Sequence, residues 1–442
     1  MSNIKYPAYV GKAYLFKLAI PIFFSNLVIP LVSIVDTALM GHLSNQSYLA
    51  ATAIASTVIT MIFWSFGFLR MGTVGLVSQA LGKGDYREIV SSLIRGLIIA
   101  IILATLIIIL KNQILIAIKF FFKPSDGIFN LISNYISVRV FSAPAELIIY
   151  VLTGFFLGLQ KTKISSLLVS LFCILNILLS IYFVQFLELN IIGVALGTLV
   201  AAYLSVISFI LYTHFFIVKK FKIIPRINKN LFTRKKIFKL FNINFDIFIR
   251  TILLTFSFVW IQYLSSKLGE NYLAANTILL QFIVISAFFL DAYAFATEGV
   301  VGYSIGRRVK KSFLSNVKSS IEISFITSIC ISFIYIIFGK NIINLLTDLE
   351  VIRFLTYGFL FWIVAIPPIA SFCYQLDGIF VGASQTSQMR NAMIVSVAIY
   401  IPTSLYFFEV ISNHGIWLSL LIFMILRSLS LKFYFNSILK RF

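Results

Sequence analysis

The chain has 442 residues, of which 60% are hydrophobic and only 12% are charged, and its mean hydropathy is +1.00. This balance excludes a soluble globular domain and indicates a polytopic membrane protein. The net charge of +21 invites a nucleic-acid interpretation, but basic loop residues also orient membrane proteins, so we expect no nucleic-acid partner. Cys173, Cys330 and Cys373 lie in apolar runs, and we expect them to pack rather than to form disulfides.

Twelve apolar runs are long enough to cross a bilayer. They lie at about 14–40, 48–78, 90–118, 128–157, 163–187, 191–217, 240–266, 271–303, 314–339, 352–380, 388–410 and 414–436. The sequence therefore predicts an all-α membrane protein with 12 transmembrane helices. The one substantial loop, residues 218–239, holds nine basic residues and separates two six-helix lobes, residues 1–217 and 240–442. The first run is too long for a signal-peptide core, so we expect it to be retained.

The basic residues alternate between the breaks that separate these runs. The rich breaks hold Lys83 and Arg87, Lys161 and Lys163, the nine-residue cluster, the run from Arg307 to Lys311, and Arg390. The alternate breaks hold far fewer, and none lies near Glu188 or His414. By the positive-inside rule, we expect both termini and the long loop to be cytoplasmic in a multi-pass protein of the inner (plasma) membrane.

The second half of the chain repeats the first at a shift of 224 residues. Over positions 48–82, ten of 35 residues are identical, against about one in ten expected from composition. At the same shift Gly154 falls on Gly378. Two six-helix halves enter the membrane with the same orientation, which is the parallel repeat found in many transporters. The ionisable residues are not shared, since Asp36 falls on Trp260.

The stretch Leu18–Leu43 is the candidate coupling helix. It is apolar over a spanning length, contains Pro21 and Pro30, and carries one carboxylate, Asp36. Each proline removes a backbone donor and disturbs the preceding turn, so we expect two conformational hinges. An acid in a span is costly in lipid and is expected to face a protein interior or a wet cavity. Burial favours the neutral carboxyl, so Asp36 is a candidate proton site; the alternative is a solvated acid near the helix end.

Several motifs resemble those of the multidrug and toxic compound extrusion (MATE) family, in its DinF-like branch. In the first half they are Leu18-x-x-Pro21, Val35-Asp36-Thr37-Ala38-x-x-Gly41-His42-Leu43, Val77-Ser78-Gln79-Ala80-x-Gly82-x-Gly84-Asp85 and Gly154-Phe155-Phe156-Leu157-Gly158. In the second half they are Ile249-Arg250-Thr251, Leu273-Ala274-Ala275-Asn276, Glu298-x-x-x-Gly302 and Asp377-Gly378 with Gly382-x-x-x-Thr386. Their order and spacing cover nearly the whole chain.

The resemblance implies a twelve-helix antiporter that exports organic compounds, often cationic and amphipathic, in exchange for Na+ or H+. It also implies a cation site in the N-terminal lobe, which carries over to Asp36, Asn176, Ser180 and Thr198. The family's second aspartate is missing, because position 180 is Ser. A less negative site is expected to bind Na+ more weakly, which favours H+.

Other polar and aromatic residues are candidates to line a substrate cavity. Arg139 and Glu146 are two turns apart and share a helix face, so they either pair across helices or line a cavity. Asp246 and Arg250 are spaced i,i+4, and we expect them to pair with each other. The cavity candidates are Arg139, Glu146, Arg250, Asp291, Tyr14, Trp64 and Trp260. The aromatic members suit flat organic cations through cation–π contact.

The function expected from these features is secondary active antiport by alternating access. The expected partners are membrane lipid, a small organic substrate and the coupling cation H+ or Na+, and we expect a monomer without a cofactor or a bound metal. A flippase for a lipid-linked precursor is the nearest alternative, and Arg70, Arg139 and Arg250 favour it if they lie deep in a cavity. A non-transporting scaffold is opposed by the unshared acids. An enzyme is not expected, because clustered His or acid ligands and the H-E-x-x-H, G-x-S-x-G and phosphate-loop motifs are missing from the sequence.

Overall fold

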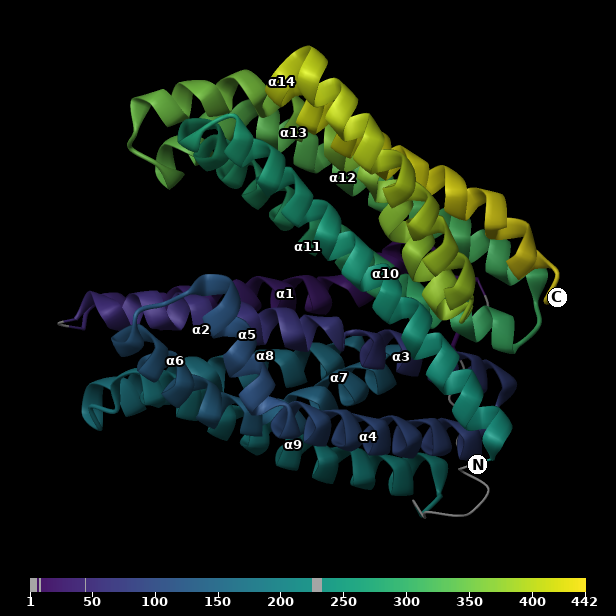
Figure 1. Cartoon of the computed structure of the whole chain (residues 1–442). Coiled ribbons are helices and arrows are strands. Elements are labelled where there is room, and N and C mark those ends of the chain that lie inside the picture. The colour runs from purple at the N-terminus through teal and green to yellow at the C-terminus, as the bar shows by residue number, and fades with distance from the viewer. Residues whose placement is uncertain (1–5, 8, 44, 225–232) are drawn as a thin grey trace. The chain divides into compact units, whose positions relative to one another are not determined.

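The computed structural model describes residues 6–7, 9–43, 45–224 and 233–442, except the side chains of residues 235, 237 and 239. All regular secondary structure in these ranges is helical (Figure 1). The α-helices of the first half are α1 (Lys12–Gly41), α2 (Gln46–Ser65), α3 (Phe68–Lys83), α4 (Tyr86–Ile109), α5 (Lys111–Phe122), α6 (Asp126–Arg139), α7 (Ala143–Gly158), α8 (Thr162–Ile181) and α9 (Asn190–Phe221). Those of the second half are α10 (Arg234–Lys267), α11 (Glu270–Gly306), α12 (Lys310–Leu346), α13 (Glu350–Gly382) and α14 (Thr386–Leu439). Two short elements are the 3₁₀ turn η1 (Val140–Ser142) and the π-helix η2 (Tyr182–Phe186).

The predicted membrane spans are all present as helices. Within the described ranges, eleven helical segments are long and apolar enough to cross a bilayer. The last of them, α14, covers two predicted spans and is broken by non-helical backbone at Ile411 and Ser412. The predicted long loop is shorter than expected, because α9 continues to Phe221 and α10 begins at Arg234. The loop residues Arg226 and Lys229 lie outside the described residues.

The described residues form two compact units. One comprises Pro21–Phe238, and the other comprises Tyr6–Ile20 with Lys239–Phe442. The boundary in the first helix therefore falls at Pro21, although α1 is helical through both of its prolines.

Repeat-related glycines pack against repeat-related backbone in the two units. A β-carbon on Gly154 of α7 would lie 2.4 Å from the carbonyl oxygen of Arg70 on α3. The equivalent β-carbon on Gly378 of α13 would lie 2.6 Å from the carbonyl oxygen of Ala294 on α11. Arg70 and Ala294 are themselves related by the shift of 224 residues. The internal repeat read from the sequence is thus a repeat of helix packing.

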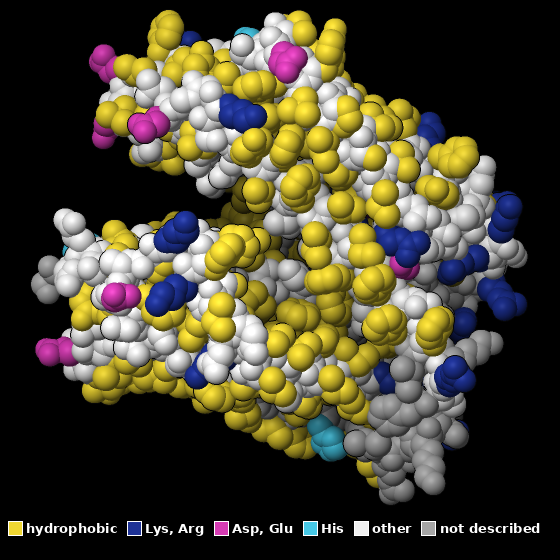
Figure 2. All heavy atoms as spheres, viewed as in Figure 1, with side chains coloured by type: hydrophobic (Ala, Val, Ile, Leu, Met, Phe, Trp, Pro, Cys, Tyr) yellow, Lys and Arg dark blue, Asp and Glu magenta, His cyan; other side chains and the backbone are white. Residues whose placement is uncertain are grey.

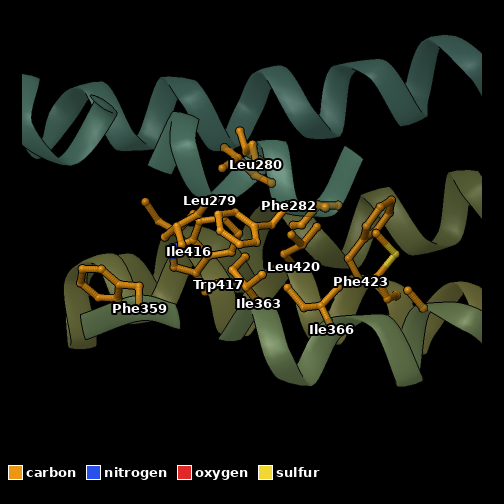
Figure 3. Packing of buried hydrophobic residues seen from close by; sticks show 14 of the residues in the cluster. Leu279, Leu280, Phe282, Phe359, Ile363, Ile366, Ile416, Trp417, Leu420 and Phe423 are labelled. Carbon is orange, nitrogen blue, oxygen red and sulfur yellow. The ribbon is translucent and has the colours of Figure 1, made fainter. Parts of the chain in front are cut away.

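The core of the second unit lies between α11, α13 and α14 (Figure 3). Leu279 and Phe282 of α11 pack with Trp417 and Phe423 of α14, and Ile363 of α13 packs into the same cluster. Each buried apolar side chain of this size contributes about 1.5–3 kcal/mol relative to an exposed one in water. Within a bilayer the gain comes instead from close packing and hydrogen bonds between helices.

Large apolar side chains also cover much of the visible surface (Figure 2). Phe121, Phe354 and Phe433 are 77%, 81% and 81% exposed, respectively. Exposure of this kind is unfavourable in water but suits contact with lipid. The chain is therefore a multi-pass membrane protein.

Candidate functional site

The predicted cation-site residues converge in the first unit on α1, α8 and α9. Asp36 lies near the C-terminal end of α1, Asn176 and Ser180 lie one turn apart on α8, and Thr198 lies on α9. The side chains of Asn176, Ser180 and Thr198 are buried, and Asp36 is half-buried. The four residues come from three helices, so only the tertiary fold brings them together.

The three neutral residues form one chain of hydrogen bonds. The Ser180 hydroxyl donates to the Asn176 side-chain oxygen at 3.2 Å. The Asn176 amide donates to the Thr198 hydroxyl at 3.0 Å, and that hydroxyl donates to the Val194 carbonyl oxygen at 3.1 Å. The chain fixes the rotamers of all three side chains and leaves the Ser180 oxygen free to accept a hydrogen bond.

A glycine lets the two helices approach at this chain. A β-carbon on Gly197 would lie 2.5 Å from the Ser180 hydroxyl oxygen and 2.7 Å from the Ser180 backbone nitrogen. Any side chain there would push α9 away from α8 and separate Thr198 from Asn176. Gly197 is thus a positioning residue for the site.

The Asp36 carboxyl has one oxygen ready for a ligand. It interacts electrostatically with Arg139 and with the Ser180 hydroxyl. Its Oδ1 atom is buried and has no hydrogen-bond partner among the residues that the structure describes. A buried acceptor without a partner is costly, so this oxygen is a natural position for a proton or a cation.

Arg139 is already neutralised by a second carboxylate. Its guanidinium forms an ion pair with Glu146, whose Oε1 atom accepts a hydrogen bond from the Ser142 hydroxyl at 2.7 Å. The guanidinium also lies 5.1 Å from the centre of the Phe63 ring. The sequence left two alternatives for Arg139 and Glu146, pairing across helices or lining a cavity; in the structure they pair with each other.

Asp36, Glu146 and Arg139 together carry one net negative charge when both acids are ionised. Asp36 and Glu146 each carry one negative charge when ionised, and Arg139 carries one positive charge. The remaining charge matches a single proton or one monovalent cation. The Asn176 side-chain oxygen accepts from Ser180 and the Thr198 hydroxyl accepts from the Asn176 amide, so Oδ1 of Asp36 is the acceptor of this group without a partner among the described residues.

The equivalent position in the second unit is closed by an indole. Trp260 and Ser404 correspond to Asp36 and Ser180 at the shift of 224 residues. The Trp260 indole nitrogen donates to the Ser404 hydroxyl at 2.8 Å, and its ring stacks on Phe256. A neutral N–H donor therefore stands where the first unit has a carboxyl, and Trp260 is half-buried.

The predicted local pair of Asp246 and Arg250 is wrong. Asp246 on α10 pairs with Arg390 of α14 at 2.7 Å and accepts from the Thr386 hydroxyl at 2.9 Å. Arg250 pairs with Asp377 of α13 instead. Both partners come from helices packed beside α10, which the i,i+4 spacing does not reveal.

Asp377 is shared by two buried arginines. It accepts hydrogen bonds from Arg250 and, at 2.6 Å, from Arg427 of α14. All three residues are at most 8% exposed. Arg427 was not among the predicted site residues, although an arginine inside a predicted membrane span is by itself an indication of a functional site.

The remaining cavity candidates are spread over both units. Trp64 on α2 is 63% exposed. Tyr14 on α1 and Asp291 on α11 are half-buried, and Asp291 interacts with Tyr374 of α13. Their roles in substrate contact stay predictions.

Known proteins resemble this chain over most of its length. A family model described as MatE matches residues 21–183 and 247–406. The DNA damage-inducible protein F of Escherichia coli (strain K12) is 33% identical over 420 residues, which is 94% of this chain and 90% of that protein. The multidrug export protein MepA of Staphylococcus aureus (strain NCTC 8325) is 22% identical over 429 residues, which is 94% of this chain and 92% of MepA.

Solved structures share the fold. An outward-facing multidrug resistance MATE family transporter matches with a TM-score of 0.86 and 18% identity, over 97% of this chain and 96% of its own. A MOP superfamily transporter from Pyrococcus furiosus matches with a TM-score of 0.87 and 18% identity, over 98% of this chain and 97% of that transporter's chain. At this identity the likeness concerns the fold.

Proposed function

The chain belongs to the MatE family of multidrug and toxic compound efflux transporters, and on that premise we propose that it exports amphipathic organic cations in exchange for protons that bind Asp36. The observation that carries the proposal is the unpartnered Oδ1 atom of Asp36 beside the neutralised Arg139–Glu146 pair. The relatives named above as multidrug resistance or export proteins support an organic substrate. They do not favour a lipid-linked precursor, which was the nearest alternative.

The coupling ion that fits the site best is H+. A sodium ion needs several oxygen ligands, whereas the Asn176 oxygen and the Thr198 hydroxyl already accept hydrogen bonds from Ser180 and from the Asn176 amide. A proton needs one acceptor, and Asp36 offers it. Protonation makes the Asp36 carboxyl neutral. A neutral group costs less free energy to bury than a charged one, and protonation therefore favours a conformational change at the site.

The transport cycle follows from competition between a proton and an organic cation for the negative charge of Asp36. Protonation of Asp36 leaves the first unit without its surplus negative charge, so an organic cation held by that charge is released. Deprotonation restores the charge and prepares the next binding event. We place this exchange in an alternating-access cycle with hinges at Pro21 and Pro30, in a monomer that contacts lipid in the inner membrane with both termini cytoplasmic.

The test is export of ethidium from reconstituted vesicles under an imposed pH gradient and, separately, an imposed Na+ gradient. We expect the pH gradient to drive export by the wild type, and Asp36→Asn to lower the rate at least about tenfold, because one proton-transfer group is lost. Asp126→Asn is the matched control, since Asp126 is an exposed acid at the start of α6. Wild-type export by Asp36→Asn under either gradient would refute the role of Asp36. Export driven by Na+ alone would refute proton coupling.

A further inference from the structure

A pocket of about 680 Å³ lies in the first unit, between the end of α1 and the turn that joins α8 to α9. Its lining residues are Val35, Ala38, Leu39, His42 and Leu43 from α1 and its end, and Ile181, Val184, Gln185, Glu188 and Asn190 from the turn region. We propose that this pocket is the vestibule through which the coupling cation reaches Asp36, with Glu188 as its electrostatic guide. The inference rests on the proposed function of Asp36.

The pocket adjoins the site through two pairs of chain neighbours. Val35, which precedes Asp36, lines it from α1, and Ile181, which follows Ser180, lines it from α8. Asp36 interacts with the Ser180 hydroxyl, and its Oδ1 atom is the unpartnered acceptor of the site. The pocket thus lies beside the turn of α1 that carries Asp36 and the turn of α8 that carries Ser180.

The backbone at the pocket mouth departs from ordinary helix geometry. Tyr182–Phe186 form a π-helix, a form that is often found at functional sites. Glu188 and Asn190 have φ angles of 52° and 49°, in the left-handed region that residues other than glycine seldom adopt. The Leu189 N–H donates to the Phe183 carbonyl oxygen at 3.1 Å and holds the turn closed.

The charge of the pocket favours a cation. Its two titratable lining residues are Glu188, which is exposed, and His42. His42 contacts the Ala38 carbonyl oxygen through Nδ1 at 2.7 Å, so its Nε2 atom is left as the acceptor in the neutral ring. The whole chain carries a net charge of +21, which repels cations. A carboxylate in a concave pocket offsets that field locally and raises the concentration of cations there.

The pocket is roomy enough to contain water. Its volume exceeds by far the roughly 30 Å³ that one water molecule occupies in the liquid. Side chains of Gln185, Glu188 and Asn190 supply the polar partners that such water needs. A hydrated cation can therefore enter without first losing its whole hydration shell.

The first test compares Glu188→Gln with Asp126→Asn and Asp36→Asn in the vesicle assay. Export is measured against the proton concentration on the side that drives transport. We expect Glu188→Gln to raise the half-saturating proton concentration about two- to fivefold, the size expected for the loss of one nearby charge that is partly screened by water. The rate at saturation is expected to stay unchanged, and Asp126→Asn to match the wild type.

The second test changes the charge in the pocket while the size of the group introduced there stays nearly constant. Gln185 is exposed and lines the pocket, so Gln185→Cys can be modified in a Cys330→Ser background, which removes the exposed native cysteine. We expect a cationic methanethiosulfonate reagent to raise the half-saturating proton concentration and an anionic reagent of similar size to lower it. Equal inhibition by both reagents would overturn the electrostatic role and indicate simple blockage, including blockage of an organic substrate.

The outcomes separate this inference from the function on which it rests. If Asp36→Asn abolishes gradient-driven export while Glu188→Gln and both modified forms match the wild type, the vestibule is refuted and the role of Asp36 stands. If Asp36→Asn exports like the wild type, the proposed function itself fails.

Discussion

Gly378 of α13 lies so close to Ala294 of α11 that a β-carbon on Gly378 would be 2.6 Å from the Ala294 carbonyl oxygen. The neighbour is backbone on α11, so it cannot rotate away as a side chain would. The same approach occurs between Gly154 and Arg70 in the first unit. The contact therefore sets the distance between paired helices in both units.

Gly378→Ala is expected to destabilise the second unit by about 1–3 kcal/mol, because the new methyl group forces α13 away from α11. The measurement is thermal unfolding in detergent. Gly358→Ala in the same helix is the control, since a β-carbon there meets nothing within 4 Å. That variant is expected to be neutral or slightly stabilising, by up to about 1 kcal/mol. Equal effects of the two substitutions would contradict the close approach.

Asp377→Asn is expected to destabilise the second unit by about 3–5 kcal/mol, because it leaves two buried arginines without a counter-charge. Arg427→Met is expected to cost less, since the Arg250–Asp377 pair stays neutral. Thermal unfolding of both variants gives the order. Asp348→Asn serves as a control, because Asp348 pairs with Arg353 at the surface and its side chain is fully exposed. A milder effect of Asp377→Asn than of Arg427→Met would argue against a shared counter-ion.

Thr198→Val is expected to cost about 1–3 kcal/mol, because the buried Asn176 amide loses its acceptor at nearly constant side-chain volume. Thr213→Val on the same helix is the matched control, since the Thr213 hydroxyl bonds only to the Phe209 carbonyl oxygen, at 2.6 Å. Thermal unfolding of the two variants is compared. The idea of a linked chain at the site fails if they are indistinguishable.

Asn276→Leu is expected to destabilise the break in α14 by about 1–3 kcal/mol, since buried polar partners are left unsatisfied. The Asn276 side chain joins Asn413 at 2.6 Å and accepts from the Trp417 indole at 3.0 Å. Protection from amide hydrogen exchange near residues 411–417 reports the change. Thr277→Val controls for the position, because the exposed Thr277 hydroxyl bonds only within α11. Unchanged exchange in Asn276→Leu would show that the network does not hold the break.

Hydropathy and the internal repeat were enough to predict the helices and the two-lobe fold, because a bilayer demands long apolar helices. The break at Ser412 inside α14 and the π-helix at Tyr182–Phe186 were not predicted, since each depends on contacts with other helices. The polar chain through Asn176 and Thr198 joins residues that the family resemblance had already grouped.

The partners of the buried ion pairs could not be predicted from the spacing of residues in the sequence. Residues four apart on a helix can always meet, but a buried charge selects the partner with the best geometry and desolvation. Asp246 therefore pairs with Arg390, which is 144 residues away. The electrostatic interaction of Asp36 with Arg139 was likewise not predicted, because α1 and α6 are far apart in the chain.

The single surplus negative charge around Asp36 also bears on the energetics of export. Exchange of one proton for one monovalent organic cation moves no net charge across the bilayer. The membrane potential then does no work on the cycle, and each pH unit across the membrane supports about tenfold accumulation. A neutral compound exported by the same exchange would carry one charge inward per turnover, so its export would respond to voltage as well as to pH.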